Sequence, residues 1–147
     1  MLLSFTERFP DLFETIKTIT APFQQRFVLQ QNVTFDEVKA AYENAAICLV
    51  PSIWAEPFGR VAAEGHLGGC CVISSGSGGL REVSADSAFY LEDTTPETIS
   101  MALMKMMGDP NTREDLALKG NKRANQIFSL EDSADSFEKA LISTLNP

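Results

Sequence analysis

The sequence is poor in basic residues, and this scarcity removes two classes of partner. Only 12 lysines and arginines stand against 20 acidic residues, which gives a formal net charge of −8. Nucleic-acid binding requires basic patches that neutralise backbone phosphates, so the composition argues against a nucleic-acid partner. An acidic surface equally offers nothing to anionic lipid headgroups. We therefore predict no nucleic acid and no membrane contact from this part of the protein.

Long apolar runs, paired cysteines and histidine clusters are also missing. No apolar run reaches the roughly 20 residues of a membrane span, and the N-terminal residues make a poor signal peptide. Cys48, Cys70 and Cys71 are odd in number and lie in apolar runs, which is typical of reduced core thiols and predicts a cytoplasmic protein. The single histidine, His66, has no zinc-ligand spacing to these cysteines. We expect no metal and no cofactor, and we predict His66 as a partly buried surface residue.

Two short apolar runs, 46–50 and 70–74, predict buried strands in the middle of the chain. A turn-rich connection at 54–59 and a helix-like segment at 60–67 join them, and the second run ends in Ser75-Gly76-Ser77-Gly78-Gly79. Buried strands that alternate with helices indicate a parallel sheet. The loops that follow such strands form a crevice in which ligands bind.

The remaining pattern extends this alternation and ends in helices. Thr34 and Glu37 form a capping box ahead of a helix that reaches Asn44, and Pro96 begins a helix to Met107 whose buried side is predicted to hold Ile99, Leu103, Met106 and Met107. Further helices are expected at 79–83, 111–128 and 131–145, the last capped by Ser129, and strands at 27–29 and 88–91. Residues 7–20 favour a helix, with a strand at 13–18 as the alternative. The predicted fold is a Rossmann-like, doubly wound α/β sheet with a helical C-terminal tail, in a single domain spanning residues 1–147.

The run E-P-F-G-R-V-A-A-E opens with Glu56 and closes with Glu64, and G-S-G-G-L-R-E-V follows the second strand. A bare pair of glutamates eight positions apart is common, whereas E-P-F-G-x-x-x-x-E between two buried strands is specific. From about Val33 to Val83 the chain resembles the C-terminal, donor-binding domain of the retaining "group one" (family four) nucleotide-sugar glycosyltransferases. That resemblance implies one half of a GT-B fold and a nucleoside diphosphate sugar as donor substrate.

The resemblance also implies roles for individual residues. Glu56 would contact the transferred sugar as the catalytic residue, and Glu64 would accept hydrogen bonds from both ribose hydroxyls, because an ionised carboxylate has two oxygens and no donor. The backbone amides of Phe58 and Gly59 would point at the donor from a helix N-terminus. The loop lining the donor cleft would contain Ser77, Gly78 and Gly79.

Each of these residues also has an ordinary structural interpretation. Taken alone, Glu56 is an acidic residue at a helix start, and Glu64 is a solvated helix residue. The glycine segment matches neither the dinucleotide-binding nor the P-loop motif. Arg60 and Arg81 are either phosphate contacts or surface arginines. Trp54 is predicted to pack against the protein rather than to serve as a stacking platform.

Two parts of the family pattern are not found in this sequence. No segment before Val33 matches the glycine-containing loop with the phosphate-clamping arginine and lysine, and an N-terminal acceptor-binding domain is not recognisable. We therefore expect a fragment of a glycosyltransferase of hexosyl type that needs that domain as partner and is inactive alone. Two alternatives remain open: a related GT-B phosphorylase or synthase, and a non-catalytic α/β interaction domain.

Overall fold

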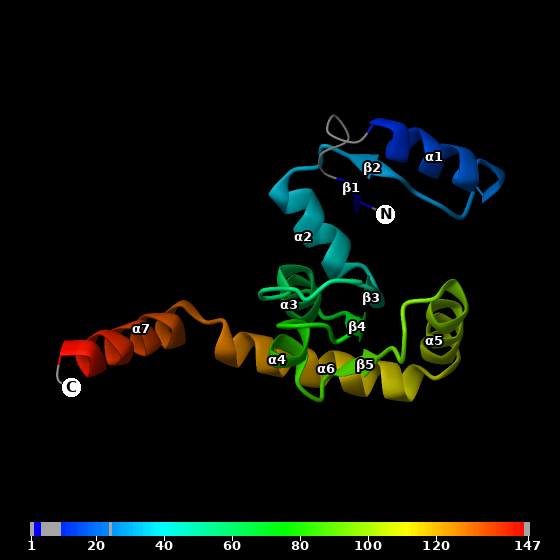
Figure 1. Cartoon of the computed structure of the whole chain (residues 1–147). Coiled ribbons are helices and arrows are strands. Elements are labelled where there is room, and N and C mark those ends of the chain that lie inside the picture. Colours follow the sequence, from blue (N-terminus) through cyan, green and yellow to red (C-terminus); the bar gives the residue numbers. More distant parts are fainter. Residues whose placement is uncertain (1, 4–9, 24, 146–147) are drawn as a thin grey trace. The chain divides into compact units, whose positions relative to one another are not determined.

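The computed structural model describes residues 2–3, 10–23 and 25–145 of the chain. These residues form two compact units, which divide between Ala41 and Tyr42. Figure 1 shows the elements of both units in chain order.

The first unit pairs two short strands and contains one longer helix. Strand β1 (Leu2–Leu3) runs parallel to β2 (Gln30–Gln31). Helix α1 (Pro10–Thr20) continues into a 3-10 turn, η1 (Ala21–Phe23). The helical prediction for this segment is confirmed from Pro10 onward, and positions 7–9 lie outside the described residues.

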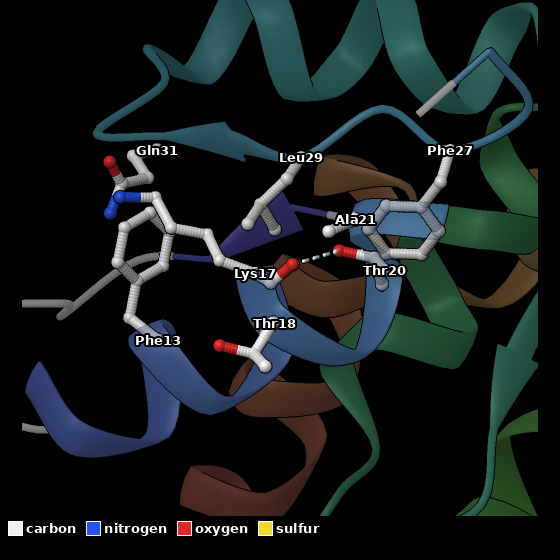
Figure 2. A pocket seen from close by; sticks show the side chains of 8 residues that line it. All are labelled: Phe13, Lys17, Thr18, Thr20, Ala21, Phe27, Leu29 and Gln31. Carbon is white, nitrogen blue, oxygen red and sulfur yellow. Dashed lines mark hydrogen bonds between the residues drawn. The ribbon is translucent and has the colours of Figure 1, made fainter. Parts of the chain in front are cut away.

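The predicted strand at 27–29 is wrong, because the paired residues are Gln30 and Gln31. Phe27 and Leu29 instead line an open pocket of about 570 Å³ beside α1, while Val28 is 68% exposed. The pairing therefore lies three residues beyond the predicted start of the strand. Figure 2 shows Phe13 and Phe27 at opposite ends of this pocket, and the Lys17 ammonium lies 4.5 Å from the centre of the Phe13 ring.

The predicted capping box at the start of α2 (Phe35–Glu43) is confirmed. The amide of Glu37 donates to the Thr34 hydroxyl at 3.3 Å, and the amide of Thr34 donates to Glu37 Oε2 at 2.7 Å. The amide and the hydroxyl of Thr34 both donate to the Glu37 carboxylate, which stabilises its ionised form and lowers the pKa of Glu37. The first turn of α2 therefore begins where the sequence predicts.

The second unit is built on a three-stranded parallel sheet. Its order is β3 (Ile47–Val50), β4 (Cys71–Ser74) and β5 (Ala88–Tyr90), with Val50 opposite Ser74 and Ser74 opposite Tyr90. Helices α3 (Arg60–Leu67) and α4 (Leu80–Ser84) connect the strands. The predicted strands at 46–50, 70–74 and 88–91 are confirmed to within one residue at their ends.

Both faces of this sheet are covered, as in a doubly wound fold. One core cluster joins Cys48 and Val72 of the strands to residues of α3 and α4. The other joins Cys71 and Ile73 to helices from the C-terminal part of the chain. Alternate residues of β4 thus enter opposite layers, and all four of its residues are buried, because a strand with helices on both faces has no solvent side.

Three helices follow the sheet, and each begins at a side-chain cap. They are α5 (Pro96–Gly108), α6 (Pro110–Ile127) and α7 (Leu130–Leu145). Their first turns donate to the oxygens of Thr95, Asp109 and Ser129, as expected for N-caps. In the described part of the chain no helix is both long and apolar enough to cross a membrane.

The predicted buried side of α5 is correct except for Met107, which is 67% exposed. Ala102 and Met106 are the buried pair, four residues apart on one face of the helix. Met107 lies 100° further round and therefore leaves the core.

The chain's single histidine is fully buried, which corrects the expectation of a partly exposed residue. His66 is 1% exposed, and its Nε2 lies 3.0 Å from the hydroxyl of Ser84 in α4. Its Nδ1 has no hydrogen-bond partner and faces Gly120 of α6. The spacing in α3 could not reveal this burial, because α6 covers His66 from more than fifty residues away in the sequence.

Burial of His66 predicts a loss of stability in mild acid. Burial, with a smaller effect of the Arg123 charge, lowers the pKa of His66 from 6.5 to about 4. Between these values the unfolded chain binds the proton and the folded chain does not, so stability falls as the pH falls. From pH 7 to pH 5 we expect a loss of about 2 kcal/mol.

Urea unfolding at a series of pH values measures this loss. Because the chain has one histidine, a His66→Gln variant serves as the control and should show a much flatter dependence from pH 7 to pH 5. Parallel curves for the two proteins would contradict the prediction.

Candidate functional site

The loops that follow β3 and β4 leave the sheet side by side. The amide of Ser75 donates to the carbonyl of Val50 at 3.0 Å, which extends the pairing of the two strands by one residue. The carbonyl of Ser74 in turn accepts from the amide of Leu91 at 2.9 Å. The segments 51–59 and 75–79 therefore start from neighbouring positions at the carboxyl edge of the sheet, where the sequence predicts a ligand site.

Glu56 is attached to the glycine loop through its backbone. It forms a parallel bridge with Gly78, and its carbonyl accepts from the amide of Gly79 at 2.7 Å. Its carboxylate accepts from the Ser52 hydroxyl, with 2.7 Å between the oxygens. Both the backbone and the side chain of Glu56 are thus fixed.

Glycine is required where the two loops meet. Gly78 has a φ of +61°, and a Cβ there would collide with the Glu56 carbonyl and lie 2.7 Å from its amide nitrogen. A Cβ on Gly79 would lie 2.8 Å from the Cα of Phe58. These approaches are too short for any side chain, so the glycines serve close packing of backbone against backbone.

Helix α3 begins at this junction and directs its free amides toward it. Gly59, with a φ of +96°, is its N-cap, and its carbonyl accepts from the amides of Ala62 and Ala63. The amides that precede Ala62 lie ahead of the intrahelical bonds and can bind an anion. Gly59 therefore makes the turn and opens the helix, and the contact of its amide with a donor stays a prediction.

Phe58 is 48% exposed, and its side chain has an aromatic partner. Its ring meets that of Phe128 edge to face, with 5.4 Å between the ring centres. The two phenylalanines also line a cavity of about 310 Å³ with Gly79, Val83 and Arg123. The contact of the Phe58 backbone amide with a ligand stays a prediction.

Glu64 lies one turn into α3 and is held by two neighbours. Arg60 Nε lies 2.9 Å from Glu64 Oε1, and the Tyr42 hydroxyl donates to the same carboxylate. Burial, together with the charges of Cys48 and Glu64, raises the pKa of Tyr42, so this hydroxyl keeps its proton. Glu64 is 24% exposed on its side chain, which leaves it able to accept further hydrogen bonds.

Neither Tyr42 nor Ser52 was identified from the sequence. Ser52 lies four residues before Glu56, and its polar side chain in a turn was the one available signal. Nothing in the sequence indicates that Tyr42 contacts Glu64, because Tyr42 lies at the end of α2, far from the motif in the sequence. Arg60 was considered as a phosphate contact or a surface arginine, and the structure shows it paired with Glu64.

Ser77 lies within the glycine loop, and Arg81 follows the loop in the first turn of α4. Ser77 is half-buried, and its amide lies 3.4 Å from the Ser75 hydroxyl. The Arg81 guanidinium stacks 3.8 Å from the centre of the Tyr90 ring, and both side chains lie against Gly76. Arg81 is therefore a positioned cation at the mouth of the loop.

Trp54 is 57% exposed, which corrects the expectation that it packs against the protein. Its neighbour Ile53 is 87% exposed. Both lie in the turn between Ser52 and Glu56, which projects from the sheet. Residue pattern alone does not distinguish a buried tryptophan from an exposed one in such a turn.

The arrangement can bind a polyhydroxylated anion. Glu56 and Glu64 are hydrogen-bond acceptors for hydroxyl groups, while the amides at the start of α3 are donors for phosphate oxygens. Among the described residues no group of three histidine, cysteine, aspartate or glutamate side chains is placed to hold a metal ion. The thiols are buried, and burial raises the pKa of Cys71 to about 11, which keeps it protonated.

Solved structures with this fold include glycosyltransferases. Sucrose-phosphate synthase from Thermosynechococcus elongatus superimposes with a TM-score of 0.76 at 23% identity, over 90% of this chain and 34% of that one. HepE of Anabaena, solved with UDP and with UDP-glucose, reaches 0.79 and 0.78 at 18% identity, over 97% of this chain and 40% of that one. These likenesses show the GT-B type of fold.

Sequence comparison identifies the family. An uncharacterized glycosyltransferase of Methanocaldococcus jannaschii is 28% identical over 104 residues, which are 69% of this chain and 26% of that protein. The chain thus spans about a quarter of the length of this relative. The sequence model of "Glycosyl transferases group 1" matches residues 12–123, which contain both glutamates and the glycine loop. The chain therefore belongs to the group 1 glycosyl transferases.

Proposed function

We propose that the chain is the donor-binding half of a retaining glycosyltransferase. The complete enzyme would move a sugar from a nucleoside diphosphate to an acceptor hydroxyl, through a transition state with oxocarbenium character. The attachment of the Glu56 loop to the glycine loop, directly ahead of α3, carries this proposal. It combines a fixed carboxylate with free helix amides at the carboxyl edge of a parallel sheet.

In this proposal each residue has a separate task. Glu56, whose carboxylate is oriented by Ser52, contacts the transferred sugar. The amides of Phe58 and Gly59 hold the diphosphate, because helix N-termini present unbonded N–H groups. The loop of Ser77, Gly78 and Gly79 lines the cleft beside them. Glu64 accepts from the two ribose hydroxyls while Tyr42 and Arg60 hold its carboxylate in place.

The donor class is proposed from the site and from a structural neighbour. HepE has been solved with UDP and with UDP-glucose on the same fold. The site of this chain has hydrogen-bond donors and acceptors that suit such a ligand. An acceptor-binding domain would complete the enzyme, so we expect no transfer by residues 1–147 alone. The net charge of −8 gives no long-range attraction for an anionic donor, so binding relies on local amide groups.

Replacing Glu64 with alanine should weaken donor binding by about ten- to a hundredfold. The reason is the loss of charge-assisted hydrogen bonds to the ribose, each contributing roughly 1.5–3 kcal/mol. Calorimetric titration with UDP, GDP, UDP-glucose and GDP-mannose measures the change. Tyr42→Phe removes only the supporting hydroxyl and should give a smaller loss.

The matched control is Glu92→Ala, which removes an exposed carboxylate after β5. Its affinity should equal that of the unaltered chain. Equal heats for the Glu64 and Glu92 variants, or a folded chain that binds none of the four compounds, would contradict the proposal. The second result would leave the non-catalytic interaction domain as the better description.

A further inference from the structure

Trp54 is exposed in a segment that is otherwise held in place. The Ser52 hydroxyl bonds to the Glu56 carboxylate at 2.7 Å and so closes a five-residue loop with Trp54 at its middle. The loop starts at Ser52, two residues after the last residue of β3, and it ends at the bridge between Glu56 and Gly78. The exposed indole is therefore presented by an anchored loop rather than by a free end.

The exposure of Trp54 has no internal explanation among the described residues. Tryptophan is among the largest apolar side chains, and proteins usually bury most of its surface. Trp54 belongs to neither of the two core clusters. Phe58, four residues further along, does find a ring partner in Phe128. Phe58 is nevertheless 48% exposed, so the difference is that Trp54 has no ring partner among the described residues.

The chemistry around Trp54 matches one class of ligand. A pyranose ring has hydroxyl groups around its rim and a face of C–H groups that carries partial positive charge. The negative face of an indole attracts such a C–H face. Glu56 lies two residues away, within about 7 Å along the backbone, and its carboxylate accepts hydrogen bonds from rim hydroxyls. A flat aromatic face beside a fixed carboxylate therefore fits a saccharide.

We propose that Trp54 is the stacking platform for a sugar ring at the site that contains Glu56, and that it contributes to the choice of saccharide. This proposal rests on the proposed function of the chain as a donor-binding domain. The ring comes from one of two sources, the sugar of the donor or a free acceptor saccharide. Ile53, which is 87% exposed, widens the apolar surface beside the indole.

The test uses Trp54 itself as the reporter, because it is the single tryptophan of the chain. Quenching of its fluorescence by acrylamide is measured without ligand, with UDP, with UDP-glucose and with maltose. We expect protection from quenching and a blue shift of the emission with a saccharide but not with UDP. Protection by UDP-glucose assigns the ring to the donor, and protection by maltose assigns it to the acceptor.

Variants provide a second measurement by calorimetry. Trp54→Ala should weaken binding of the protecting saccharide by roughly two- to tenfold, the range measured for aromatic contacts, and Trp54→Phe should restore part of it. UDP affinity should stay unchanged in both. Met104→Ala, which removes an exposed side chain from α5, is the matched control and should alter neither value.

Three results separate this proposal from the proposed function. In the first result, UDP binds in a way that depends on Glu64, but neither UDP-glucose nor maltose changes the quenching of Trp54. This result would overturn the role of Trp54 and leave the donor-binding function supported. Protection that grows with protein concentration alone would make Trp54 part of a contact between copies of the chain, which also overturns it. Protection by maltose without binding of UDP would support the platform and reject the donor site.

Discussion

Replacing Gly120 with alanine is expected to lower the free energy of unfolding by about 3 kcal/mol, as overpacking of a buried site does. Gly120 lies inside α6, where alanine would ordinarily stabilise a helix by up to about 1 kcal/mol. Here a Cβ would collide with Nδ1 of His66 and lie 2.6 Å from its Cε1. The collision should outweigh the helix propensity.

Neither partner can move away easily. The side-chain amide of Asn121 donates to the carbonyls of His66 and Leu67 at 3.0 and 2.9 Å. The Arg123 side chain donates to the carbonyls of Val83 and Glu82 at 3.0 and 2.8 Å. These bonds hold α6 against the ends of α3 and α4, so relief of the collision would break several of them.

Thermal and urea unfolding measure the effect, and a loss of 3 kcal/mol corresponds to a melting point lower by roughly 10 °C. Gly108→Ala is the matched control, because nothing lies within 4 Å of a Cβ there. In a His66→Ala background the Gly120 substitution should cost less than about 1 kcal/mol, since coupled residues are not additive. An equal cost in both backgrounds would refute the collision as its cause.

The second large effect is expected for Gly78→Ala, which should destabilise the chain by roughly 2–4 kcal/mol and abolish donor binding. Alanine at the φ of +61° costs roughly 1–2 kcal/mol. The collision with the Glu56 backbone adds to this. Because the bridge between the loops would separate, Glu56 and the amides at the start of α3 would lose their arrangement.

Gly69 allows the cost of the backbone conformation to be separated from the cost of the collision. It has a φ of +84°, and nothing lies within 4 Å of a Cβ at this position. Gly69→Ala should therefore show the cost of the backbone conformation alone, roughly 1–2 kcal/mol, with donor affinity unchanged. If both variants lose the same stability, or if Gly78→Ala still binds the donor, the proposed junction is not what positions the site.

Local patterns predicted much of the second unit. The apolar runs at 46–50 and 70–74 marked β3 and β4, because a strand buried on both faces needs apolar residues throughout. Pro96 and Ser129 marked helix starts, because caps act within one turn. The approach of the two motif loops was also expected, since both follow neighbouring parallel strands.

Errors arose where distant segments decide the outcome. The burial of His66 depends on α6, and the partner of Glu64 comes from the end of α2. The register of β2 depends on its pairing with β1 rather than on the alternation at 27–29. Trp54 shows the opposite case, an apolar residue that no distant segment among the described residues covers. Sequence periodicity contains no information on such contacts.

The bridge between Glu56 and Gly78 also limits how enzymes with such a junction can change their ligand. The bridge attaches the loop that contains Glu56 to the sheet, so a change in the main chain of this loop would also disturb the sheet. Substitutions disturb the fold least at side chains that point into solvent near this junction, such as Ile53 and Trp54. Under the proposed function, substitutions of the side chains at 53–55 could change which sugar is recognised while the backbone stays the same.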